Sequence, residues 1–130
     1  MGFFKKNKSV DNFNATDVIL KDKIEINMNT RQCRVNKYTC GKLNNKSEKI
    51  FNIDDIINYK FDYIQMKDKA SCPVIKFNIK DFDNPVIKVS VDNYVGFKPQ
   101  EYDINGMLFT NYITLGEKTV ARLDMLLGNM

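Results

Sequence analysis

The chain has 130 residues and a net charge of +4, and its length suits one packed domain. Hydrophobic residues make up 43% of the chain, which is too large a fraction for a disordered protein. It contains no histidine, so it has neither the commonest general base nor the commonest metal ligand. Ser-His-Asp and Cys-His catalytic sites and histidine-zinc sites are therefore excluded.

The first 17 residues are polar and rich in asparagine, and we expect them to form a flexible tail before a single β-rich domain over residues 18–130. Two apolar rings and three cations in this tail would suit a weak contact with an anionic lipid surface. These residues are Phe3, Phe4, Lys5, Lys6 and Lys8. No apolar segment typical of a secretory signal follows them, and no apolar run has the length of a membrane span.

Strand signals begin at residues 24–28, where Ile24, Ile26 and Met28 alternate with polar residues. Residues 34–38 predict a partner strand, joined to the first by a turn. A turn-rich stretch follows, then a short strand over 49–53 and a helical turn near 52–56.

The middle of the chain carries the clearest strands. Residues 57–63 alternate Ile, Tyr, Phe and Tyr with polar side chains. Residues 75–79 and 87–91 alternate in the same way, and the segment between them contains Asp, Asn and Pro85, which favour a turn. Apolar side chains on one face and lysines on the other predict an antiparallel sheet with one solvated face.

The carboxy-terminal segment changes to a period of three to four residues. Apolar side chains at Phe109, Ile113, Val120, Leu123 and Leu127 predict an amphipathic helix from about residue 111, ended by a glycine at 128. An alternative is a strand over 107–115 followed by a helix from residue 117. Residues 92–106 read as a loop.

These elements predict a mainly β (α+β) fold. Six or seven antiparallel strands would form a small barrel or sandwich, and the carboxy-terminal helix would close it, as in the pleckstrin-homology-like fold.

Three segments of the chain resemble a known family. They are IFNIDDIINYKFDYI at 50–64, VIKFNIKDFDNPVIKVSVDN at 74–93 and NYITLGEKTVARLDMLLGNM at 111–130. They are similar to the second half of bacterial proteins of unknown function that begin with a start like MGFFKK, then carry a zinc ribbon and a pleckstrin-homology-like domain. Residues 1–32 contain no cysteine, so the ribbon is missing here. The resemblance implies a fold and no particular activity.

The three cysteines, Cys33, Cys40 and Cys72, make no even disulfide set and no CxxC motif. We expect structural thiols in a reducing compartment, which points to the cytoplasm. Zinc needs four good ligands, so we expect no metal and no cofactor.

The acidic residues give no catalytic constellation. Asp81 and Asp83 share a turn that they would cap, and the loop lacks the glycine and distal glutamate of a calcium site. Asp54 and Asp55 would cap the helical turn before Ile56. We therefore expect no catalytic residues and no enzyme activity.

Lys76, Lys80 and Lys88 share the predicted solvated face and are the candidate binding residues of the domain. Lysines at a sheet edge also protect against aggregation. Nucleic-acid binding is not expected, because a sheet that binds it needs aromatic side chains beside the charges.

We expect a non-enzymatic binding module whose partner is a protein. One alternative is a phage or mobile-element protein that inhibits a host protein by surface contact, and another is a weak peripheral binder of anionic lipid. The identity of the partner and the oligomeric state stay open.

Overall fold

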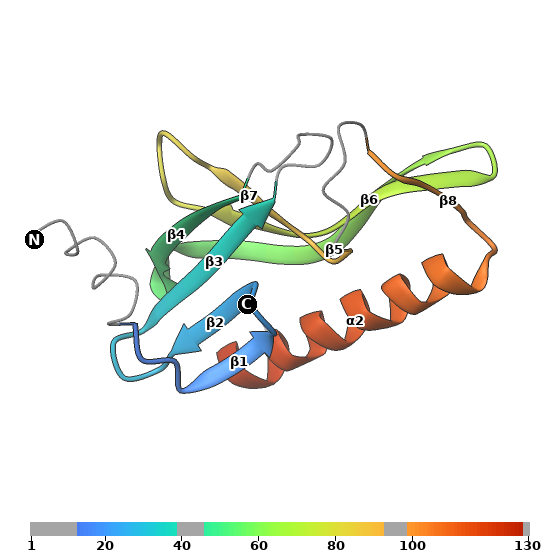
Figure 1. The fold of residues 1–130 in the computed structure, drawn as a ribbon. Coiled ribbons are helices and arrows are strands. Elements are labelled where there is room, and N and C mark those ends of the chain that lie inside the picture. The colour runs from blue at the N-terminus through green and yellow to red at the C-terminus, as the bar shows by residue number, and fades with distance from the viewer. Residues whose placement is uncertain (1–12, 39–45, 93–98, 129–130) are drawn as a thin grey trace, which may run out of the picture.

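The computed structural model describes residues 13–38, 46–92 and 99–128. Within these ranges the chain forms two antiparallel sheets and a long carboxy-terminal helix (Figure 1). We call the sheet of β1 to β4 sheet A and the sheet of β5 to β8 sheet B. No helix in the described ranges is both long enough and apolar enough to span a membrane.

Sheet A is a simple meander in which neighbours in sequence pair with each other. Its strands are β1 (Asp17–Leu20), β2 (Ile24–Asn27), β3 (Gln32–Tyr38) and β4 (Lys46–Asn52). The Asn27 side chain closes the turn between β2 and β3, because its Oδ1 accepts hydrogen bonds from the backbone N–H groups of Asn29 and Thr30. The predicted turn at these residues is confirmed.

Sheet B is built around one long central strand, β6. Its strands are β5 (Ile56–Met66), β6 (Lys69–Ile79), β7 (Val86–Ser90) and β8 (Glu101–Asp103). β6 pairs along its length with β5, while β7 pairs with its second half and β8 with its first three residues. A 3-10 turn, η2 (Ile53–Asp55), connects the two sheets, as the sequence predicts.

The core lies between the two sheets and the helix. Side chains that alternate along the strands point inward from both sheets, and most of them are inaccessible to solvent. Fully buried examples are Ile24, Ile26 and Val35 from sheet A and Ile75, Phe77 and Val89 from sheet B. Burying each such side chain contributes about 1.5–3 kcal/mol, so this cluster is the main source of stability.

The helix α2 (Met107–Leu127) packs along β5 and β6 and reaches β1 near its carboxy-terminal end (Figure 1). Leu123 is fully buried in the core. Two polar contacts fix the helix: the Tyr59 hydroxyl donates to Asp124 Oδ1 at 2.6 Å, and Arg122 donates to the Ile19 carbonyl at 3.0 Å. Gly128 ends the helix with φ +80°, a left-handed conformation that suits glycine.

The predicted fold class is confirmed. The protein is mainly β, with two antiparallel sheets and one carboxy-terminal helix, and the sheets form a sandwich-like arrangement that does not close into a barrel. Eight strands lie in the described ranges, where the sequence predicts six or seven.

Several element boundaries differ from the prediction. The helix begins at Met107, four residues before the expected start, and the alternative of a strand over 107–115 is wrong. The buried Phe109 ring explains this, because it packs between the rings of Tyr63 and Tyr102 and draws the first helical turn onto sheet B. β1 and β8 are strands that the sequence analysis does not assign.

Ile57 is also placed differently from the prediction. A register shift between Ile56 and Asn58 leaves Ile56 buried and Ile57 about half exposed. The inward alternation then continues through Tyr59, Phe61 and Tyr63 in the predicted way.

Residues 1–12 of the tail predicted over residues 1–17 lie outside the described residues. The described part before β1 contacts sheet A: the Thr16 backbone N–H donates to the Ile26 carbonyl at 2.8 Å, and the Arg34 guanidinium lies 4.9 Å from the centre of the Phe13 ring.

Candidate binding surface

Three lysines form a row across the outer face of sheet B. Lys60 on β5 lies directly opposite Lys76 on β6, and Lys76 lies directly opposite Lys88 on β7. Their neighbours Phe61, Phe77 and Val89 point into the core, so the lysines point outward because successive side chains of a strand alternate. We call Lys60, Lys76 and Lys88 the lysine row.

The lysine row brings three positive charges together, and one acidic side chain, Asp62, lies two residues along β5 from Lys60 on the same face. Side chains directly opposite each other on antiparallel strands lie about 4.5–5.5 Å apart at their Cβ atoms, and like charges there are destabilising. The ion pairs within the described ranges involve Arg31, Arg34 and Lys49, and none involves the row. A bound anion would relieve this repulsion.

The surroundings of the row on the same face are mixed, because Val86 and Val74 lie there among polar side chains. Two residues from the row toward the β6–β7 turn, the Asn78 amide donates to Asn58 Oδ1 at 2.5 Å. Val86 on β7 lies opposite Asn78. In the other direction along β5 lies Asp62, whose Oδ1 accepts from the Tyr63 backbone N–H at 2.9 Å. Aromatic side chains of β5 and β6 point to the other side of the sheet, toward the core.

The structure brings together two of the three lysines that the sequence analysis selects. Lys76 and Lys88 are direct cross-strand partners. Lys80 lies beyond the end of β6, where its backbone N–H donates to the Asp55 carbonyl at 2.8 Å. The pKa of the Asp54 carboxyl is lowered mainly by its hydrogen bond with Arg31, and Lys80 adds to this effect, so Lys80 belongs to a mixed cluster of charges.

Lys60 is the residue of the row that the sequence analysis does not select. Its outward position follows from the alternation of residues 57–63, which does predict a polar face there. Its place beside Lys76 depends on the long hairpin of β5 and β6, whose register includes two irregularities. The candidate residues Phe3, Phe4, Lys5, Lys6 and Lys8 lie outside the described residues.

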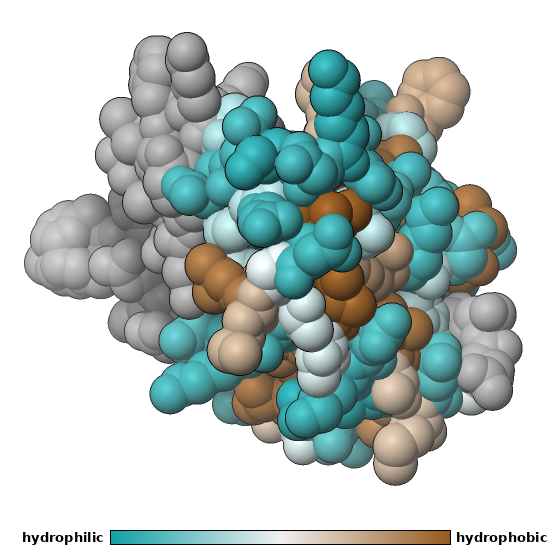
Figure 2. Space-filling model, turned by 90° about the vertical axis from the view of Figure 1, so that its right-hand side faces the viewer, coloured by the Kyte–Doolittle hydropathy of each residue, from teal (hydrophilic) through white to brown (hydrophobic). Residues whose placement is uncertain are grey.

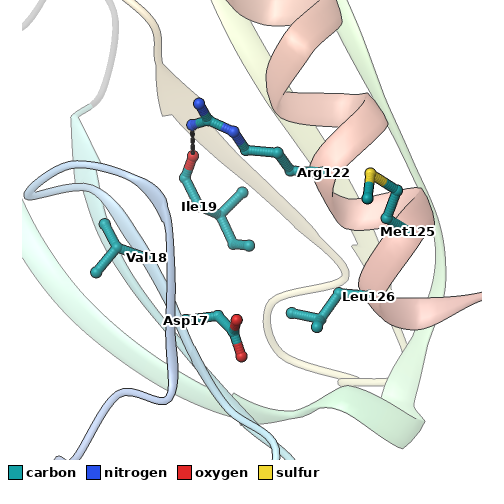
Figure 3. A pocket seen from close by; sticks show the side chains of 6 residues that line it. All are labelled: Asp17, Val18, Ile19, Arg122, Met125 and Leu126. Carbon is teal, nitrogen blue, oxygen red and sulfur yellow. Dashed lines mark hydrogen bonds between the residues drawn. The ribbon is translucent and has the colours of Figure 1, made fainter.

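A second surface feature is a shallow hollow of about 270 Å³ between β1 and the end of α2. Figure 3 shows Arg122 reaching from the helix to the Ile19 carbonyl across its upper side. Its walls are Asp17, Val18, Ile19, Arg122, Met125 and Leu126. The hollow is smaller than the roughly 300–1,000 Å³ of small-molecule sites and holds few polar groups, so it is a weaker candidate.

The end of the molecule that carries the β5–β6 hairpin has no single apolar patch in view. Figure 2 looks onto the right-hand side of Figure 1 and shows hydrophobic residues interspersed among hydrophilic ones. Scattered exposed apolar residues are normal on protein surfaces. This face therefore gives no candidate site.

A buried polar cluster joins the two sheets. Lys23 Nζ donates to the Ser90 and Asp92 carbonyls at 2.7 and 2.6 Å, and the Tyr102 hydroxyl donates to Asp92 Oδ2 at 2.5 Å. Burial lowers the pKa of Lys23 to about 8 against the opposing charge of Asp92, and burial raises the pKa of Asp92. These bonds hold β7 and β8 against the β1–β2 turn, which is a structural role.

The cysteines differ from the prediction of three thiols. Cys33 is a buried free thiol, and burial raises its pKa to about 12, which makes it a poor nucleophile. Cys72 is disulfide-bonded, so the prediction of a reduced thiol is wrong for this residue. Cys40 lies outside the described residues.

The carboxylates are engaged in structural contacts. Asp81 caps its turn as predicted, whereas no side chain caps η2, and Asp54 pairs with Arg31 at 2.8 Å instead. No group of three metal-binding side chains occurs in the part of the chain that the structure describes.

Comparison of the chain with protein families, with curated proteins and with solved structures gives no match. The resemblance to bacterial pleckstrin-homology-like proteins therefore stays a prediction.

Proposed function

We propose that this protein is a non-enzymatic binding module that binds an acidic segment of a partner protein on the lysine row. The observation that carries the proposal is the register that places Lys60, Lys76 and Lys88 side by side on three strands. A protein gains nothing in stability from three opposed like charges, whereas an acidic ligand would find them already assembled.

The character of the face favours a protein ligand over nucleic acid. Sheets that bind single-stranded nucleic acid use exposed aromatic rings as stacking platforms for the bases. On β5 and β6 the rings of Tyr59, Phe61 and Phe77 pack toward the core, and asparagines lie next to the lysines. Amide side chains and lysines suit the carboxylates and backbone groups of a polypeptide.

The binding would be modest for a single acidic segment. An exposed ion pair contributes about 0.2–1 kcal/mol, so three pairs contribute about 0.6–3 kcal/mol. Removing all three charges should weaken binding about 3- to 150-fold, since 1.4 kcal/mol corresponds to a factor of ten. The binding should also weaken at high salt, because salt screens exposed charges.

A nuclear magnetic resonance titration tests this proposal. The isotope-labelled protein is titrated in separate experiments with poly-L-glutamate, with vesicles containing phosphatidylserine and with single-stranded oligo-dT. We expect poly-L-glutamate to bind most strongly, with amide shifts that centre on β5, β6 and β7. Stronger binding of the vesicles would support the lipid alternative, and stronger binding of oligo-dT would contradict the proposal.

Two triple variants of equal net charge provide the control. The first replaces the row (Lys60→Gln, Lys76→Gln and Lys88→Gln), and the second replaces exposed lysines elsewhere (Lys21→Gln, Lys67→Gln and Lys118→Gln). Only the first should lose binding of poly-L-glutamate. Equal losses in both variants would mean that net charge, and not the row, attracts the ligand.

A further inference from the structure

The β6–β7 turn presents a fully exposed aromatic ring. Phe82 is 100% exposed, whereas Phe77 and Phe109 are 0% exposed. An exposed phenylalanine gains none of the free energy that burial of its ring would provide. Burial against another molecule would recover that free energy.

Hydrogen bonds within the turn and an ion pair with β4 stabilise the turn that carries Phe82. Asp81 Oδ1 accepts hydrogen bonds from the backbone N–H groups of Asp83 and Asn84 at 3.0 and 3.2 Å, and Asp81 Oδ2 pairs with Lys49 at 3.1 Å. The contact with Lys49, together with the backbone hydrogen bonds from Asn84 and Asp83, lowers the pKa of the Asp81 carboxyl. The Ile79 backbone N–H donates to the Pro85 carbonyl at 2.9 Å and closes the base of the turn. A group on such a preorganised turn loses little conformational entropy on binding.

The turn is continuous with the lysine row. Val86 lies opposite Asn78 at the end of β7, and the next outward pair along the two strands is Lys88 and Lys76. Two residues along a strand span about 6.6 Å, so the row begins within reach of any ligand that contacts the turn. Val86 is itself 44% exposed, which adds apolar area between Phe82 and the lysines.

We infer that Phe82 is the anchor of the interface: its ring inserts into an apolar pocket of a partner protein while acidic residues beside that pocket face the lysine row. The inference rests on the proposed function and specifies the partner. Buried aromatic anchors surrounded by weaker polar contacts carry most of the binding energy in protein interfaces. The lysines would then set orientation and association rate.

The charges next to Phe82 favour a protein pocket over a membrane. Asp81 and Asp83 flank the ring in sequence, and Asp83 is exposed. Insertion of the ring into an anionic leaflet would press both carboxylates against anionic headgroups. A protein pocket can place hydrogen-bond donors at its rim opposite these carboxylates.

Site-specific photocrosslinking tests the inference. A photoreactive p-benzoylphenylalanine replaces Phe82 in the full chain, which is produced in cells of the organism that encodes it. The same residue is placed in separate chains at Met107 and Met125, which are 80% and 86% exposed and lie on α2. We expect one discrete protein adduct at position 82 and none at the two helix positions.

The captured protein is then purified, and its affinity is measured for the unmodified protein and for the Phe82→Ala variant. Phe82→Ala should weaken binding about 30-fold or more, the loss typical of a dominant anchor. Its thermal unfolding should match that of the unmodified protein, because a fully exposed ring makes no packing contribution. The absence of an adduct at 82, equal adducts on the helix, a lipid adduct or unchanged affinity of Phe82→Ala would each overturn the inference.

Combining the crosslinker with the two triple variants separates this inference from the proposed function. The adduct should disappear when Lys60, Lys76 and Lys88 are replaced and persist when the three control lysines are replaced. An adduct that survives loss of the lysine row would contradict the proposed function and leave Phe82 as the anchor. Lysine-dependent binding of poly-L-glutamate without an adduct at position 82 would support the proposed function and overturn the role of Phe82 as the anchor.

Discussion

Replacing Gly116 with alanine tests how α2 is seated on sheet B. Gly116 is buried in the middle of the helix, where a Cβ atom would lie 2.2 Å from Cδ1 and 2.6 Å from Cε1 of the Phe61 ring. Cβ atoms do not approach other heavy atoms closer than 3.0 Å, so the ring or the helix must move. Glycine is therefore required here by close packing, although it is a poor helix former.

Two opposing contributions decide whether Gly116→Ala raises or lowers the free energy of unfolding. Alanine in place of glycine favours a helix by about 0.8–1 kcal/mol. Overpacking a core costs about 1–3 kcal/mol, and an overlap with a ring held on both sides belongs at the upper end. Phe61 is held in this way, because it lies against the helix and packs near Tyr63 with ring centres 5.9 Å apart. We expect Gly116→Ala to lower the free energy of unfolding by about 1–2 kcal/mol.

Urea unfolding followed by circular dichroism measures this change. Thr114→Ala is a control on the exposed side of the same helix, and it should be neutral or slightly stabilising. In a Phe61→Leu background the clash is relieved, so Gly116→Ala should then be neutral or stabilising. Stabilisation of the original protein by Gly116→Ala would refute the close packing of Phe61 on the helix.

Three further predictions concern the core, the buried lysine and the cysteines. Leu123→Ala should cost about 2–5 kcal/mol because the side chain is fully buried, and Leu126→Ala should cost less in the same urea assay because Leu126 is half-buried. The lowered pKa of Lys23 means that the unfolded chain binds more protons between about pH 8 and 10.5, so this group makes stability rise with pH in that window. Between pH 7.5 and 9.5 the stability of the original protein should therefore change in a more favourable direction than that of Lys23→Met, whereas the raised pKa of Cys33 acts in the opposite direction in both proteins. Thiol titration of the unfolded, unreduced chain should find fewer than three thiols, since Cys72 is disulfide-bonded while Cys33 is free; three reactive thiols would contradict this.

The elements that could be predicted from sequence are those whose side chains alternate without interruption. The hairpin of β6 and β7 and the second half of β5 each place apolar residues at every second position, because one face is buried and the other solvated. The carboxy-terminal helix shows its own period for the same reason. These patterns were sufficient for the fold class.

The elements that sequence could not supply depend on contacts between distant residues. β8 has three residues, and it is a strand only because Tyr102 is buried beside Ala70 and Phe109. The start of α2 is set by the packing of Phe109 on rings from β5 and β8. Ile57 points outward because the pairing of β5 with β6 is irregular between Ile56 and Asn58. The alternation of apolar and polar residues in the sequence does not reveal this irregularity.

The candidate site, like the fold, could be predicted from the sequence only in part. Outward lysines are visible in the sequence, because each lies between inward apolar residues. Their alignment into a row requires the register of two strand pairs, and that register also separates Lys80 from Lys76 and Lys88. The exposure of Phe82 depends on the turn as well, since the same residue type is buried at positions 77 and 109.

The most direct measurement for the central claim is the stability of Lys76→Gln with and without poly-L-glutamate. Lys76 is opposed by a lysine on each side, and two like-charged pairs cost about 0.4–2 kcal/mol in total at low salt. Lys76→Gln should therefore unfold at higher urea than the original protein in 10 mM salt, and the difference should vanish in 1 M salt. Poly-L-glutamate should stabilise the original protein more than the variant. A variant that is less stable at low salt, with equal effects of poly-L-glutamate on both proteins, would contradict a lysine row built to bind an acidic partner.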